Sequence, residues 1–129
     1  MGSMEISASG LYAQRMRMDT IANNLANAET TRTAQGGPYQ RKTPIFQEDV
    51  EHGGVKVDAI AADPRPFPQI HQPGHPDADP ATGIVQLPNV NPVEEMVDLV
   101  AASRAYEANV AALNASKAMV QKSLEIGHE

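Results

Sequence analysis

The sequence has no cysteine and no tryptophan, and its aromatic residues are three tyrosines and two phenylalanines. Without cysteine, neither a disulfide framework nor a thiolate metal site is possible. There is no run of 18 apolar residues and no recognisable secretory signal. The net charge is -6 and Lys and Arg form no cluster, which argues against binding to a nucleic-acid backbone.

Large apolar residues are also scarce. Leu, Ile, Val and Phe together account for 25 of the 129 residues, and much of the remaining apolar fraction is alanine. This lies just under the composition at which a chain readily buries a core of its own. The length suits one domain, and we expect that domain to be marginally stable alone or to depend on partners.

A helix is predicted over residues 5–28. Its large apolar side chains are spaced seven, three and four positions apart, which keeps them on one stripe. These residues are Leu11, Met18, Ile21 and Leu25.

The same segment contains three asparagines, although asparagine is a poor residue for the interior of a helix. At roughly 100° per residue, Asn23 and Asn27 fall opposite the apolar stripe and Asn24 flanks it. Their amides could make hydrogen bonds across a contact with another protein. They could equally cap the end of the helix and face water. Spacing alone leaves both interpretations open.

The middle of the chain, residues 36–90, is rich in glycine and proline. Short β-prone runs separated by turn residues predict a small antiparallel β module with one long loop at residues 71–83. The runs span residues 39–46, 54–60, 67–71 and 83–87.

The clearest element is a second helix, predicted over residues 92–126. Asn91 is a suitable N-cap, Pro92 fits the first helical position and Glu94 lies three residues after the cap. Gly127 is a natural end. At 1.5 Å per residue the helix is about 50 Å long.

This helix carries two stripes. A heptad pattern starting at Met96 predicts a seam that packs on the first helix as an antiparallel coiled-coil-like pair, so the fold class is α+β. The seam consists of Met96, Leu99, Ser103, Tyr106, Val110, Leu113, Lys117, Val120 and Leu124.

A second stripe of the same helix is made of alanine, where a solvated face would normally carry Lys and Glu. It could pack closely against neighbouring protein, or it could reflect only the high helix propensity of alanine. Its members are Ala101, Ala105, Ala108, Ala112 and Ala115.

Motifs for chemistry are weak. His71, His75, Asp77 and Asp79 could suggest a metal site, but the prolines and glycine among them exclude a helical histidine pair and favour a structured turn. No nucleophile elbow, P-loop or dinucleotide-binding motif is present. We therefore predict no catalytic residue, no cofactor, no metal and no small-molecule substrate, and expect a protein that is not an enzyme.

Three parts of the chain resemble bacterial flagellar rod and hook proteins. IANNLANAET at residues 21–30 resembles the N-terminal signature of that family, with its core at residues 24–27. VEEMV at residues 93–97 and ASRAYEAN at residues 102–109 resemble its C-terminal motif. The middle segments resemble the proximal-rod members, and they are YQRK at residues 39–42, PGHPDAD at 73–79, GIV at 83–85 and LPNVN at 87–91.

The resemblance covers Glu5 to Gly127 and implies a structural subunit of the basal-body rod, the torque-transmitting shaft of the motility apparatus. It implies that residues 5–28 and 91–126 form a helical assembly domain, with residues 36–90 as the β module. The implied partners are other rod and basal-body proteins, copies of the chain itself and the flagellar type III export apparatus, with export that needs no cleaved signal peptide and with no nucleic acid.

One departure from the family concerns Met1 to Met4, which read as a vector-derived start in place of several apolar residues. We expect this start to affect export and polymerisation. The alternative to the rod hypothesis is a cytoplasmic helix-pairing module that forms a discrete dimer or heterodimer.

Overall fold

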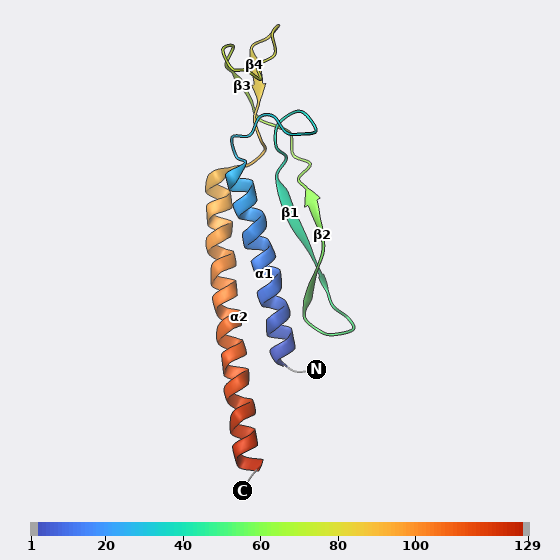
Figure 1. Ribbon diagram of the computed structural model, residues 1–129, viewed down its shortest axis with the longest axis vertical. Coiled ribbons are helices and arrows are strands. Elements are labelled where there is room, and N and C mark those ends of the chain that lie inside the picture. The colour runs from blue at the N-terminus through green and yellow to red at the C-terminus, as the bar shows by residue number, and fades with distance from the viewer. Residues whose placement is uncertain (1–2, 128–129) are drawn as a thin grey trace.

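The computed structural model describes residues 3–127 and has the predicted α+β fold (Figure 1). Two long helices lie at the ends of the chain and four short strands lie between them. In chain order the elements are α1 (Ser3–Ala26), β1 (Lys42–Glu48), β2 (Val55–Ala62), β3 (Gln69–His71), β4 (Ile84–Gln86) and α2 (Pro92–Gly127).

The two helices pack side by side and antiparallel, and α2 continues for several turns past the start of α1 (Figure 1). The predicted N-cap of α2 is confirmed, because the Oδ1 atom of Asn91 accepts hydrogen bonds from the backbone N–H groups of Val93 at 3.0 Å and Glu94 at 3.4 Å. Neither helix within residues 3–127 has the combination of length and hydropathy that a membrane span requires.

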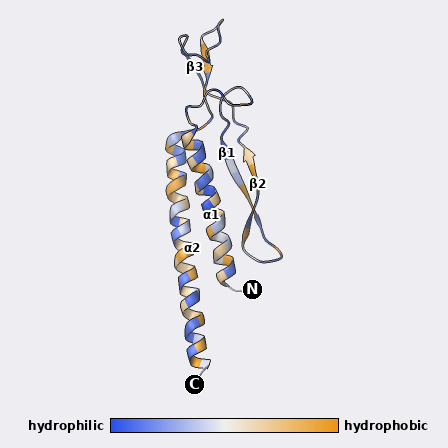
Figure 2. Ribbon diagram, in the orientation of Figure 1, coloured by the Kyte–Doolittle hydropathy of each residue, from blue (hydrophilic) through white to orange (hydrophobic). Residues whose placement is uncertain are grey.

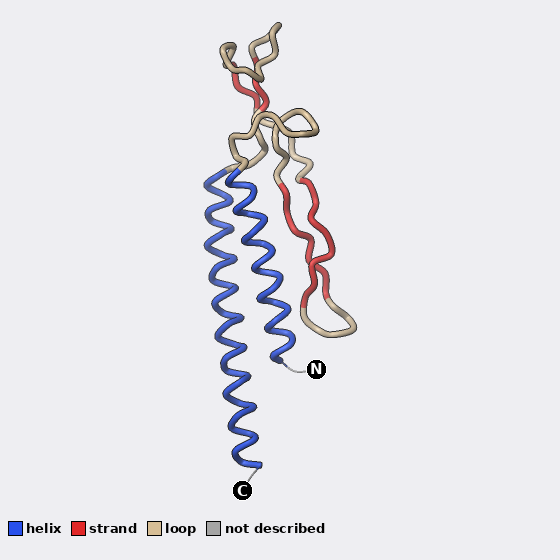
Figure 3. The backbone as a smooth tube through the Cα atoms, in the orientation of Figure 1, coloured by secondary structure: helices blue, strands red, loops and turns tan. Residues whose placement is uncertain are grey.

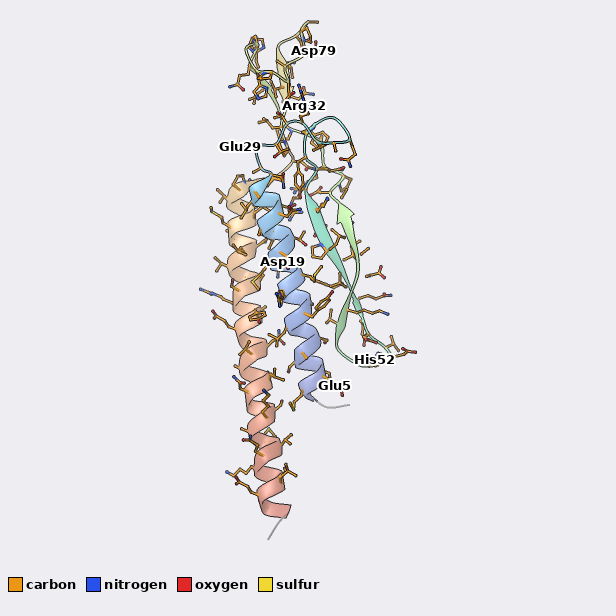
Figure 4. The ribbon with its side chains drawn as sticks, viewed as in Figure 1. Glu5, Asp19, Glu29, Arg32, His52 and Asp79 are labelled. Carbon is orange, nitrogen blue, oxygen red and sulfur yellow. The ribbon has the colours of Figure 1, made fainter. Side chains whose placement is uncertain are left out.

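The strands form two separate hairpins rather than one sheet. β1 pairs with β2 from Lys42↔Ala62 to Glu48↔Val55, and β3 pairs with β4. The β1–β2 hairpin runs along α1, whereas β3–β4 stands beyond the ends of the helices (Figure 3). The tip of the first hairpin, around His52, lies near Glu5 and the first turns of α1 (Figure 4).

The hydrophobic core is small. Its buried apolar residues include two alanines, and apolar residues recur along the whole of α2, including its exposed positions (Figure 2). The buried apolar residues are Ala13, Ile21, Tyr39, Val85, Val90 and Ala102.

The face of α2 that contacts α1 differs from the predicted seam. Leu99, Tyr106 and Leu113 are half-buried, as the heptad pattern requires. The alternate positions are instead Glu95 and Ala102, the two buried residues of α2, whereas Met96 is 58% exposed. Half of the seam positions are thus replaced by the residue before them, which lies about 100° away on the helix, while the other half are unchanged. The centre of the contact therefore rotates by about 50°.

Met96, predicted to pack against α1, is mostly exposed and follows the fully buried Glu95. Ser103 and Val110 lie half-buried at the edge of the contact, and Lys117, Val120 and Leu124 are exposed near the end of α2. Glu95, which takes the position expected for Met96, accepts hydrogen bonds from Asn24 of α1 and from Arg41 just before β1. Apolar periodicity cannot reveal such partners.

Candidate functional site

A buried polar cluster joins α1, α2 and the two hairpins, and Asn24 lies at its centre. The Asn24 amide is fully buried and pairs with the backbone of Lys42, donating from Nδ2 to the carbonyl oxygen at 2.8 Å and accepting the N–H at 3.0 Å. The Tyr39 hydroxyl donates to the same Oδ1 atom at 2.8 Å. Burial, and then the charge of Glu95, raise the pKa of Tyr39, which keeps this hydroxyl protonated as a donor.

The Glu95 carboxylate is also fully buried. It accepts hydrogen bonds from the Nε atom of Arg41 and, at 3.4 Å, from Nδ2 of Asn24. Arg41 also contacts carboxylates of Asp63 at 3.2 Å and Asp98 at 3.7 Å. Burial lowers the pKa of Arg41, but its hydrogen bonds to Glu95 and Asp63 outweigh that effect and raise it overall.

Asp63 and Asn89 complete the cluster at the base of the hairpins. Hydrogen bonds from the Arg65 side chain lower the pKa of Asp63 to about 2, with Arg41 adding to the effect and burial opposing it. Asn89 accepts the backbone N–H of Arg41 at 2.6 Å and donates to the carbonyl oxygens of Asp63 at 3.1 Å and Arg65 at 2.9 Å. Every buried side-chain nitrogen and oxygen in the described part of the chain has a hydrogen-bond partner. The cluster therefore has a structural role: it holds the two helices and the hairpins together.

Opposite the contact with α1, the first turns of α2 carry an exposed apolar patch. We call Val93, Met96, Val97 and Val100 the outer stripe; their exposed fractions are 68%, 58%, 62% and 54%. At about 100° per residue, Val93, Val97 and Val100 lie on the opposite side of the helix from Ala102. Figure 4 shows side chains of α2 projecting on the side away from α1.

Known proteins resemble this chain over almost its whole length. The family model "Flagella basal body rod protein" matches residues 4–32, and the model "Flagellar basal body rod FlgEFG protein C-terminal" matches residues 81–126. The flagellar basal-body rod protein FlgC of Bacillus subtilis is 46% identical, covering 97% of this chain and 96% of the relative. FlgC of Borreliella burgdorferi is 42% identical, covering 96% and 95%, and FlgC of Salmonella typhimurium is 42% identical, covering 95% and 94%.

The chain belongs to the FlgC family of flagellar basal-body rod proteins. This membership confirms the resemblance drawn from the sequence motifs. The two family models cover α1 and nearly all of α2, so the terminal helices are what this chain shares with the wider group of rod proteins. Asn24 and Glu95 both lie in these matched segments.

The structure gives the three asparagines of residues 21–30 three different roles. Asn24 is the buried hub. Asn27 donates from Nδ2 to the carbonyl oxygen of Asn23 at 2.9 Å, which adds a second hydrogen bond to a carbonyl that also accepts the backbone N–H of Asn27 at 3.2 Å. Asn23 is exposed, and its side chain donates to the Tyr39 hydroxyl at 3.4 Å and accepts from Nδ2 of Asn27 at 3.3 Å.

The other residues predicted to take part in packing differ in burial between α1 and α2. On α1, Ile21 is buried and Leu11, Met18 and Leu25 are half-buried. On α2, Ala101, Ala108 and Ala112 are exposed and Ala105 is half-buried. Their part in assembly remains a prediction.

In the long loop, His75 and Asp79 make hydrogen bonds within the loop, whereas Asp77 binds residues outside it. The Nδ1 atom of His75 accepts the backbone N–H of Asp77 at 3.0 Å, and Asp79 accepts that of Ala81 at 2.8 Å. Asp77 binds Arg32 and Thr31. Within residues 3–127 no group of three or more His, Asp or Glu is arranged to hold a metal ion.

Sequence reasoning missed five members of the polar cluster: Tyr39, Arg41, Asp63, Asn89 and Glu95. Tyr39 and Arg41 lie within YQRK, and Asn89 and Glu95 lie within LPNVN and VEEMV, the motifs that carried the family resemblance. Membership of these motifs was the available signal, but pairings that span 22 to 71 positions could not be read from spacing.

Proposed function

We propose that this chain is a structural subunit of the bacterial flagellar basal-body rod, and that it assembles through its terminal helices into the shaft that transmits torque. Family membership supports the rod role. The observation that supports the helical mode of assembly is the outer stripe, which leaves four large apolar side chains of α2 exposed on the side opposite α1. Its function is assembly rather than catalysis.

The energetics favour a covered stripe. Fully burying a Val or Met side chain stabilises by about 1.5–3 kcal/mol relative to full exposure. The outer stripe residues lie at positions i, i+3, i+4 and i+7, so one neighbouring helix can contact all four. Exposed alanines at Ala101, Ala108 and Ala112 lie on the adjacent side of α2, about 90° round the helix from the outer stripe, and allow close approach of a neighbouring backbone.

The proposed partners are other rod and basal-body proteins, copies of this chain and the type III export apparatus. The proposed location is the rod of the basal body. The β1–β2 hairpin, which lies on a different side of α1 from α2, would make lateral contacts outside the helical layer (Figure 1). The alternative, a discrete helix-pairing module, has no support from the relatives found.

Sedimentation and light scattering across protein concentration test this proposal. The parent chain should show open-ended growth in mass, and Val97→Asp should stay monomeric because it places a charge in the outer stripe. Val50→Asp is the matched control, since Val50 is 89% exposed but lies in the tip of the hairpin. It should assemble like the parent.

Two results would contradict the proposal. A dimer of fixed mass at all concentrations would favour the helix-pairing alternative. Parent-like growth of Val97→Asp would remove the outer stripe from the assembly contact.

A further inference from the structure

The helix α2 has two competing faces for α1. The heptad pattern of its apolar residues would place Met96, Ser103 and Val110 against α1. The structure centres the contact on Glu95, Ala102 and Asn109, which are likewise seven residues apart. Ser103 lies at the edge of this contact, with its hydroxyl oxygen 3.6 Å from Sδ of Met18 on α1. Met and Val remove more apolar area from water than Ala does, so apolar burial alone favours a contact centred on Met96, Ser103 and Val110.

Glu95 opposes that preference. Its carboxylate is fully buried and receives hydrogen bonds from Arg41 and Asn24. Rotating α2 to bury Met96 would pull the carboxylate away from both donors. A buried charge left without its partner is strongly destabilising, and Arg41 would lose the carboxylate that it binds within hydrogen-bond distance through Nε.

A contact between Gly10 of α1 and Asn109 of α2, two heptads after Glu95, agrees with the observed side of α2 facing α1. A side chain added at Gly10 would place its Cβ 2.6 Å from Oδ1 of Asn109, so the bare glycine makes room for this amide. The Asn109 amide in turn donates to the carbonyl oxygen of Ala105 at 2.9 Å. The fully buried Ala102 lies midway between Glu95 and Asn109.

We propose that Glu95, acting through Arg41 and Asn24, sets the rotational register of α2 against α1. By rotational register we mean which side of α2 faces α1. A single buried polar residue in a helix seam can specify such a register at a cost in stability. The register keeps Met96 in the outer stripe instead of the core, and its consequence for assembly rests on the function proposed above.

Disulfide trapping in the full chain tests the register directly, because the sequence has no cysteine of its own. The pair Gly10→Cys with Asn109→Cys reports the observed register, and Gly10→Cys with Val110→Cys reports the rotated one. At low protein concentration, oxidation of the otherwise unchanged chain should cross-link the first pair in preference to the second, within one chain.

Adding Glu95→Ala removes the carboxylate without placing a large apolar side chain on the observed face, so it should raise the yield of the 10–110 disulfide relative to the 10–109 disulfide by roughly tenfold, since the loss of a buried ion pair exceeds that factor. The matched control is Glu94→Ala, which removes the same charge one residue earlier from a side chain that is 59% exposed. It should leave the ratio as in the parent.

An unchanged ratio in Glu95→Ala would overturn the proposal. If that variant lost its helical circular dichroism, Glu95→Gln would decide instead. Glutamine keeps the volume but loses the charge and one of the two oxygens that accept from Arg41 and Asn24. The 10–110 share should therefore rise several-fold, and a ratio equal to the parent would overturn the proposal. Since trapping needs no assembly, a failure of rod assembly in sedimentation would count against the proposed function alone.

Discussion

The side chain of Asn24 pairs with the backbone of Lys42 as a neighbouring β-strand would, with both hydrogen bonds at or below 3.0 Å. The amide of a helical residue thereby holds the first residue of β1. Three groups, the Lys42 N–H and carbonyl and the Tyr39 hydroxyl, make hydrogen bonds to this one buried side chain.

Asn24→Ala should therefore lower the free energy of unfolding by about 3 kcal/mol, because it removes all of these hydrogen bonds at a fully buried position. Urea denaturation measures the change. Asn23→Ala is the control, since Asn23 is exposed and should change stability by no more than about 0.5 kcal/mol. Equal losses at the two positions would show that Asn24 is not the hub.

The tip of the β1–β2 hairpin depends on Gly54, whose φ is +80°. The Ser9 hydroxyl accepts the backbone N–H of Val55 at 3.1 Å, and an added Cβ at Gly54 would collide with Ser9 and crowd the backbone of Ile6. Gly54→Ala should detach the tip from α1, seen as faster hydrogen exchange at residues 49–55.

Gly37→Ala is the control that separates backbone strain from the collision with Ser9. Gly37 has a similar φ of +76° but no heavy atom within 4 Å of an added Cβ. Gly37→Ala should cost about 1 kcal/mol from backbone strain alone, and Gly54→Ala should cost more. Equal losses would mean that the contact with Ser9 does not hold the hairpin.

Gly10 and Asn109 should be coupled energetically. Replacing glycine by alanine inside a helix is normally favourable by about 1 kcal/mol, but here the new methyl would displace the Asn109 amide. We expect Gly10→Ala to destabilise the chain by about 1 kcal/mol and the double variant with Asn109→Ala to recover most of that loss. A double-mutant cycle from urea unfolding measures the coupling, and simple additivity would exclude it.

Stability should fall in acid. The pKa of Asp63 is lowered from 3.8 to about 2 in the folded chain, chiefly by hydrogen bonds from Arg65. Because the folded state favours the carboxylate, this contribution is fully present above the unfolded pKa near 4 and is lost as the pH falls towards 2.

The measurement is the urea midpoint at pH 6, 4 and 2.5 for the parent and for Asp63→Asn. The variant should lose less stability on acidification than the parent does. The urea midpoint of the variant should still fall with pH, because the Thr31 hydroxyl, with Arg32, also lowers the pKa of Asp77. Parallel pH profiles would show that Asp63 is not ionised preferentially in the folded state.

Local patterns predicted the elements well. The helix starting at Pro92 was predicted from Asn91, whose capping hydrogen bonds involve only the next few residues. The strands were predicted within a few residues of their observed ends, because glycine and proline mark the turns. The β module was less well predicted, since its division into two hairpins depends on pairing partners rather than on composition.

Apolar periodicity did not correctly predict which side of α2 faces α1. Met96 is more hydrophobic than Glu95, and periodicity therefore placed it against α1. The outcome depends on Arg41, which is 54 positions away along the chain and arrives at the helix only when β1 packs beside α1. The sequence around Glu95 therefore gives no sign that Arg41 is its partner.

Thus the family, the two helices and the presence of apolar residues on more than one side of α2 follow from the amino-acid order, because motifs, caps and helical spacing are local properties. The rotation of α2, the burial of Asn24 and Glu95 and the position of the outer stripe follow from the folded arrangement. A buried charge must meet its partner in space, and that requirement outweighs the local preference for burying the more apolar side chain.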